Sequence, residues 1–173
     1  MPALLALLLL AATVDLRLAG PIGLLAELHA THPEIPPDYS RSPGISHLTL
    51  RVAPLPQRAG GHYDQRTRTL TMAETLLGED PRIMAAGLAH ELTHASDFDL
   101  IALGLLERDC AELEVRAFKA QAIVTRAMWP DELPTGTDWE RGLAMIVKAY
   151  EAGGAEGLRA MVAGTPVYGA ARC

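Results

Sequence analysis

The sequence has little of what a disulfide-rich miniprotein or a nucleic-acid-binding protein would need. It contains two cysteines, Cys110 and Cys173, and they do not form a CxxC pair. Two cysteines exclude a disulfide-framework miniprotein and a cysteine-based zinc knuckle. The formal net charge is −6 and no dense lysine or arginine cluster is present. Because an acidic chain repels phosphate backbones, we expect no nucleic-acid partner.

The sequence also has no apolar run long enough to span a membrane. Residues 3–14 are uncharged and mostly Leu and Ala, but a spanning helix needs about 20 such residues. The run has the length of a signal-peptide core, although no basic residue precedes it and no clean A-x-A site follows. Two interpretations stay open: an exported or surface-attached protein with a membrane-associating N-terminus, or a cytoplasmic protein in which residues 1–30 form an apolar first helix. Residues 31–173 form the main domain in both.

Short strands are expected in the first half of this domain. Aromatic residues make up 5% of the chain, whereas hydrophobic residues make up 49% and Ala and Leu are abundant, which is typical of a helix-rich globular protein. Residues 48–52 alternate in polarity and predict a strand. Residues 62–72 show the pattern of a hairpin. These segments predict a small antiparallel β element.

Helices are expected in the second half. Asp80, followed by proline, is an N-cap signal for a helix that extends to about residue 103. Asp109 begins another helix that ends near residue 129. Two further helices are expected at about 139–151 and 156–162. Together with the strands, this order predicts a helix-rich α+β fold in which the β element precedes the helix at 80–103.

The motif that carries chemistry is His90-Glu91-Leu92-Thr93-His94, an HExxH pattern on the first of these helices. Residues four apart lie on one face of a helix, so His90 and His94 can bind one Zn²⁺. Glu91 can take a proton from a metal-activated water and pass it to the leaving amine. The alternative is a pair of incidental or hydrogen-bonded core histidines. The small apolar residues before the motif favour an active-site helix.

A catalytic zinc site has three protein ligands and one open position. Glu114 lies twenty residues after His94, in the helix that Asp109 begins. Glu112 is the rival third ligand. Residues two apart on a helix face opposite sides, so only one of the two glutamates can reach the metal. We favour Glu114, because Glu112 already serves as the capping-box partner of Asp109.

The HExxH motif with Glu114 resembles the active-site helices of the gluzincin clan of zinc metallopeptidases, which includes thermolysin-like and minimal single-domain members. The resemblance covers residues 60–129, less than half of the chain. It implies a zincin-like domain with one Zn²⁺ per chain. It also implies hydrolysis of peptide bonds in a peptide or protein substrate, with the strand pair at 63–72 lining the substrate cleft by β-augmentation.

The chain departs from the thermolysin-like pattern at Phe118, where those enzymes place an aspartate that supports a histidine ligand. Asp97, on the same helix face as the histidines, is a candidate for this role; a solvated surface residue is the alternative. The clan also uses a tyrosine or histidine to stabilise the oxyanion. Tyr63 and Tyr168 are candidates, as are His62 and Tyr150, and a purely structural role is the alternative for each.

Two questions remain open from the sequence. Cys110 lies one turn before Glu114 and is expected to pair with Cys173 if the protein is exported, and to be an inert buried thiol otherwise.

The expected function is a zinc metallopeptidase. The alternative is a non-catalytic zinc-binding regulatory or protein-recognition module that has the same ligands without turnover.

Overall fold

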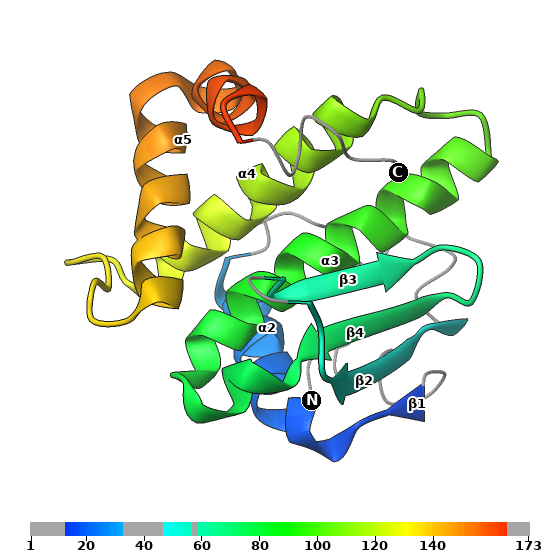
Figure 1. Ribbon diagram of the computed structural model, residues 1–173, viewed down its shortest axis with the longest axis horizontal. Helices are drawn as coiled ribbons and strands as arrows, with labels where there is room; N and C mark the ends of the chain where they lie inside the picture. The colour runs from blue at the N-terminus through cyan, green and yellow to red at the C-terminus, as the bar shows by residue number, and fades with distance from the viewer. Residues whose placement is uncertain (1–12, 33–46, 57–58, 166–173) are drawn as a thin grey trace.

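A mixed β-sheet packs against a set of helices, which confirms the expected combination of helices and strands (Figure 1). The computed structural model describes residues 13–32, 47–56 and 59–165. In chain order the elements are β1 (Thr13–Val14), the 3-10 helix η1 (Leu16–Leu18), α2 (Ala19–Thr31), β2 (Thr49–Ala53), β3 (Gly61–Asp64), β4 (Thr69–Ala73), the 3-10 helix η4 (Glu74–Gly78), α3 (Pro81–Ala102), α4 (Cys110–Met128) and α5 (Asp138–Ala163).

The sheet has the strand order β1-β2-β4-β3. The hairpin expected at residues 62–72 is present, since β3 pairs with β4 in antiparallel fashion. The expectation of a purely antiparallel element is wrong, because β1 runs parallel to β2 and β2 runs parallel to β4. Alternating polarity shows which faces of a strand are buried but not which strand lies beside it. In the described part of the chain, β3 forms one edge of the sheet.

Helix α3 lies against the sheet and contacts β3 and β4. Its first turn is defined by the side chain of Asp80, which accepts a hydrogen bond from the backbone N–H of Arg82 at 2.9 Å, and by Pro81 at the first helical position. The residues before the HExxH motif are small, and Ala85, Ala86 and Ala89 are completely buried. The motif is therefore placed on a helix that runs through the core.

The described part of the N-terminal segment belongs to the same core. Leu18, Ile22 and Leu25 are at most 1% exposed and share a hydrophobic cluster with the sheet and α3. Residues 1–12 lie outside the described residues, so a signal-like role for the first apolar run stays a prediction. No helix among the described residues is long and apolar enough to cross a membrane.

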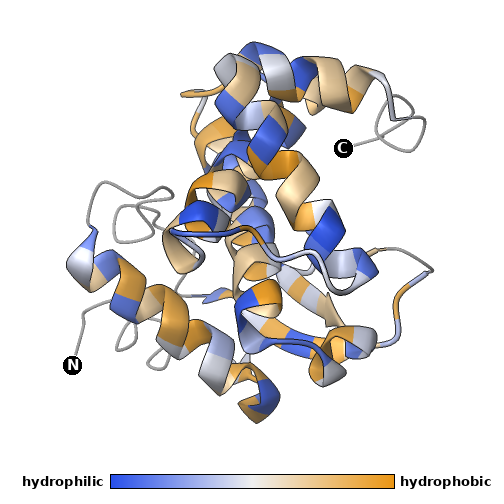
Figure 2. Ribbon diagram, turned by 90° about the vertical axis from the view of Figure 1, so that its left-hand side faces the viewer, coloured by the Kyte–Doolittle hydropathy of each residue, from blue (hydrophilic) through white to orange (hydrophobic). Residues whose placement is uncertain are grey.

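Helices α4 and α5 share a second cluster on the side of α4 away from the sheet (Figures 1 and 2). Orange hydrophobic residues recur between blue ones along these helices in Figure 2, as expected for helices with one buried face. Helix α5 is interrupted at Gly154, which has φ 58° and ψ −135°. A positive φ favours glycine, and the break separates the two helices expected at 139–151 and 156–162.

Candidate metal centre

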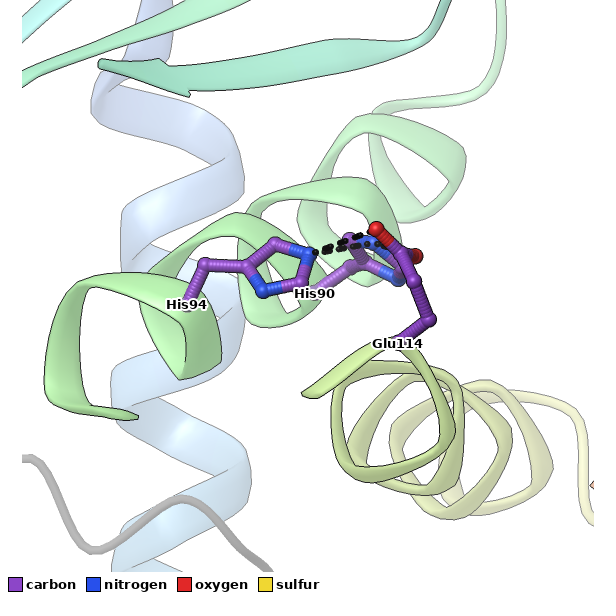
Figure 3. A group of neighbouring side chains, drawn as sticks. All are labelled: His90, His94 and Glu114. Atoms are coloured by element: carbon purple, nitrogen blue, oxygen red, sulfur yellow. Dashed lines mark hydrogen bonds and ion pairs between the residues drawn. The ribbon is translucent and has the colours of Figure 1, made fainter. Parts of the chain in front are cut away.

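Two histidines of α3 and one glutamate of α4 converge at a single point (Figure 3). The Nε2 atoms of His90 and His94 lie 3.1 Å apart. Glu114 Oε2 lies 3.5 Å from Nε2 of His90, and Oε1 lies 3.5 Å from Nε2 of His94. The three side chains are largely buried, with exposed fractions of 11%, 12% and 17%. The structure therefore brings together the three residues expected to hold a metal.

The start of α4 places Glu114 at this point. The Asp109 side chain caps the helix by accepting hydrogen bonds from the backbone N–H groups of Ala111 and Glu112 at 2.9 and 3.2 Å. Helix α4 then packs along α3, and Glu114, in its second turn, faces the histidines. Glu112 points toward α5 instead, where Arg159 donates a 2.9 Å hydrogen bond to its carboxylate. The geometry thus separates the two glutamates as the helical period requires.

The spacing of the donor atoms fits a zinc ion. Bonds of about 2.0–2.1 Å in a tetrahedral site place the ligand atoms about 3.3 Å apart. The two imidazole nitrogens lie 3.1 Å apart, close to this value, and each has a different oxygen of Glu114 at 3.5 Å. With one ligand atom from each residue, the three atoms lie within 4.8 Å of one another. Glu114 Oε2 is also buried without a hydrogen-bond partner among the described residues. Two imidazoles and one carboxylate form a donor set that suits zinc.

The charges around the cluster bias the histidines toward opposite protonation states. Burial, together with the neighbouring charge of His90, lowers the pKa of His94 to about 4, so His94 stays neutral. Burial also acts to lower the pKa of His90, but the adjacent carboxylate of Glu114 and the charge of Glu91 raise it overall. Burial acts to raise the pKa of Glu114, but His90 lowers it overall. An unprotonated imidazole and an ionised carboxylate are the forms that bind a metal.

Glu91 is set up to exchange protons near neutral pH. Its side chain is only 6% exposed, and this burial raises its pKa from 4.5 to about 7, with a contribution in the same direction from Glu114. The charge of His90 and a backbone hydrogen bond from Tyr63 act in the opposite direction. A carboxyl group with a pKa near the working pH is suited to act as a base and then as an acid.

The backbone of β3 packs directly on the Glu91 side chain. A Cβ atom added at Gly61 would lie 2.6 Å from Glu91 Cγ and 2.7 Å from Oε1. Real Cβ atoms do not approach other atoms this closely, so glycine at this position is required for Glu91 to keep its present conformation. The close contact at Gly61 therefore fixes the position of the Glu91 side chain relative to strand β3.

On the expectation of a zinc metallopeptidase, the Gly61→Ala variant should fold and bind zinc but hydrolyse peptides more slowly. The added methyl group meets Cγ and the carboxylate of the Glu91 side chain, and no backbone atom is among the three nearest atoms, so we expect the side chain to move while the backbone stays in place. A displacement of about 1 Å in a catalytic group can reduce the rate about 100-fold. Steady-state peptide hydrolysis and zinc content measure the two effects. Gly78→Ala is the matched control, since nothing lies within 4 Å of its Cβ position; equal rates for both variants would contradict the prediction.

Asp97 does not support a histidine ligand in this structure. Its carboxylate is 1% exposed and receives three hydrogen bonds from Arg116 of α4, at 2.8, 2.9 and 3.0 Å. Burial raises the pKa of Asp97, and Arg116 partly offsets the rise. The interpretation of Asp97 as a solvated residue is also wrong. Its buried carboxylate forms an ion pair with the half-exposed Arg116 that ties α3 to α4.

The residues proposed from the sequence to stabilise the oxyanion differ in their position relative to the His90, His94 and Glu114 cluster. The Tyr63 ring packs on Phe98, with ring centroids 6.0 Å apart, and burial raises the pKa of its hydroxyl. Its neighbours are Arg68, Asp99 and Asp64 rather than the histidines. Tyr168 lies outside the described residues. His62, exposed on β3, contributes electrostatically to the lowered pKa of His94.

Two residues of α4 contact the cluster although the motif did not indicate them. The ring of Phe118 meets the ring of His90 edge to face, with centroids 4.7 Å apart and planes at 67°. Gln121 is buried and acts on His90 through a hydrogen-bonding interaction that raises its pKa. Both lie on the same helix face as Glu114, four and seven residues later. That spacing was the signal available in the sequence.

Cys110 takes part in a disulfide. Cys173, its expected partner, lies outside the described residues, so the pairing stays a prediction. Cys110 is the first residue of α4, immediately after the Asp109 cap. A disulfide there restrains the end of the helix that carries Glu114.

Comparisons of the chain with protein-family models, with curated proteins and with solved structures find no match. A functional assignment therefore depends on the chemistry of the cluster itself. The cluster contains two imidazoles and a carboxylate with their donor atoms within 4.8 Å of one another, beside an acid whose pKa is about 7.

Proposed function

We propose that the protein is a zinc-dependent metallopeptidase similar to the gluzincin clan. The observation that carries the proposal is the convergence of His90, His94 and Glu114 at spacings suited to one zinc ion. Glu91 supplies the acid–base group beside this site. The proposed active site thus joins a metal-binding donor set to a buried carboxyl group next to it on α3.

Each residue has a distinct task in peptide hydrolysis. His90, His94 and Glu114 hold the zinc, which when bound supplies Lewis acidity that polarises the scissile carbonyl and activates water. Glu91 accepts the proton of the attacking water at its carboxylate and then donates it to the nitrogen of the leaving amine. Gly61 allows β3 to pack on Glu91 and so limits the orientations of the carboxylate.

The location of β3 supports a peptide as the substrate. In the described part of the chain this strand pairs with β4 on one side only, so its other edge presents backbone N–H and C=O groups. An extended peptide can add to such an edge as a further strand. Because Gly61 of β3 touches Glu91, a peptide bound in this way would lie near the proposed catalytic group.

The zinc content of the purified protein tests the proposal, with Glu114→Ala and Glu112→Ala measured in parallel by elemental mass spectrometry. We expect about one zinc per chain in the wild type and in Glu112→Ala, because catalytic zinc sites hold one ion with three protein ligands. Glu114→Ala should lose most of it. A wild-type chain that takes up no zinc when zinc is supplied would refute the proposal, as would equal loss in both variants.

A further inference from the structure

One nitrogen of His90 has no hydrogen-bond partner in the described structure. Its Nε2 atom faces Glu114 and His94. Its Nδ1 atom is buried and has no hydrogen-bond partner among the described residues. If Nε2 binds a metal, Nδ1 carries the proton and must donate it. Metal-bound histidines almost always donate this N–H to a carboxylate, a carbonyl or a water. A buried N–H without an acceptor would destabilise the site.

Among the side chains that act on His90, Glu91 and Glu114 already have roles in the proposed site, and Gln121 is the remaining acceptor. Asp97 is committed to Arg116 through three hydrogen bonds. Phe118 offers only an aromatic edge or face to the His90 ring. Gln121 is 9% exposed, lies two turns beyond Glu114 on the same helix face and already interacts with His90. Its amide oxygen is an acceptor.

We propose that Gln121 is a positioning residue that accepts the Nδ1–H hydrogen bond of His90 and so directs Nε2 toward the metal. The inference rests on the proposed zinc site and goes beyond it. It names the group that takes the place of the aspartate absent at Phe118. The current contact falls short of a formed hydrogen bond, and a metal held at Nε2 would fix the proton on Nδ1, where it needs an acceptor.

The site also explains why an amide stands here rather than a carboxylate. Glu91 and Glu114 are already buried beside His90, and burial with a neighbouring like charge raises the pKa of Glu91. A third carboxylate would increase this repulsion in the metal-free protein. Glutamine provides the acceptor without the charge.

The test compares Gln121→Leu, which removes the acceptor, with Gln121→Glu, which keeps it. Thr125→Val is the matched control, because its Oγ1 is fully buried on the same helix and has no hydrogen-bond partner in the described residues. Zinc affinity is measured by competition with a chelator. Loss of such a supporting group weakens metal binding about 10–100-fold, so we expect this loss in Gln121→Leu. Thr125→Val should bind zinc like the wild type, and Gln121→Glu at least as tightly as the wild type.

An NMR measurement distinguishes loss of the His90 hydrogen bond from a general packing defect in the Gln121→Leu variant. In the zinc-loaded wild type, the His90 Nδ1–H proton should exchange slowly with water in ¹⁵N-resolved NMR spectra. The signal should persist in Gln121→Glu and Thr125→Val and disappear in Gln121→Leu. Thermal unfolding of the metal-free variants shows whether each one folds.

Three outcomes are informative. Weaker zinc binding with loss of the Nδ1–H signal in Gln121→Leu alone supports the inference. If Gln121→Leu binds zinc as tightly as Thr125→Val, the inference is overturned while the zinc site stands. If the wild-type protein itself binds no zinc, both the inference and the proposed function are overturned.

Discussion

Replacement of Glu91 by glutamine should abolish peptide hydrolysis while the protein still binds one zinc ion. Glutamine keeps the size of the side chain but cannot take up the proton of the attacking water. General acid–base catalysis contributes about 10²–10⁴-fold to a rate, so we expect a loss of at least this order. The three proposed ligands, His90, His94 and Glu114, are unchanged, and the metal site should persist.

This variant also separates an enzyme from a zinc-binding recognition module. Cleavage of a peptide library by the wild type and Glu91→Gln is followed by mass spectrometry, with zinc content measured on the same samples. Glu107→Gln, an exposed change in the connection between α3 and α4, is the control and should cleave like the wild type. A zinc-loaded wild type that cleaves no peptide, or equal cleavage by Glu91→Gln, would argue against the peptidase.

Replacement of Arg116 by leucine should destabilise the fold strongly, because it leaves the carboxylate of Asp97 buried without a partner. Breaking a fully buried ion pair costs about 3–5 kcal/mol. The Arg116 side chain is 46% exposed, whereas Asp97 is 1% exposed. Water therefore screens part of the interaction, and we expect a loss of about 2–3 kcal/mol in the free energy of unfolding.

Urea unfolding of Arg116→Leu, Asp97→Asn and the double variant measures this coupling. The two changes should be non-additive, since the neutral amide introduced by Asp97→Asn no longer needs a cationic partner; contacting residues show coupling of about 0.5–3 kcal/mol. Arg126→Leu removes a more exposed pair with Glu151 and should cost about 1 kcal/mol or less. An Arg116→Leu protein no less stable than Arg126→Leu would show that the pair does not hold the helices together.

The metal cluster was predictable from the sequence because it depends mainly on the helical period. His90 and His94 are one turn apart, so any helix that includes both presents them on one face. The choice of Glu114 over Glu112 followed from the same period and from the expected capping box of Asp109. The Asp109 cap is in place, but the Glu112 side chain pairs with Arg159 and is not its capping-box partner. The caps and prolines at the helix ends act over a few residues and are therefore visible in a short window of sequence.

The roles of Asp97 and Gln121 were not predictable in this way. Asp97 lies on the histidine face of α3, but its partner is Arg116 on α4, and nothing within α3 encodes that choice. Gln121 becomes relevant only because α4 packs along α3 at a distance that brings it to His90. The aromatic contact between Phe118 and His90 depends on the same packing.

In the sheet, the positions of most strands were predictable from local sequence, but the neighbours of each strand were not. Alternating polarity identified β2, β3 and β4, and the short connection between β3 and β4 indicated their antiparallel pairing. It did not show that β2 lies on the other side of β4 in parallel, or that β3 becomes an edge against Glu91 through Gly61. The sequence by itself determined the long helices, the strands β2, β3 and β4 and the HExxH face, because these depend on periodicity and caps. It did not indicate β1, which lies at the end of the apolar run assigned to a signal core or a first helix. Only the tertiary structure decided the ion-pair partners, the edge strand and the acceptor beside His90, because these depend on contacts between residues far apart in the chain.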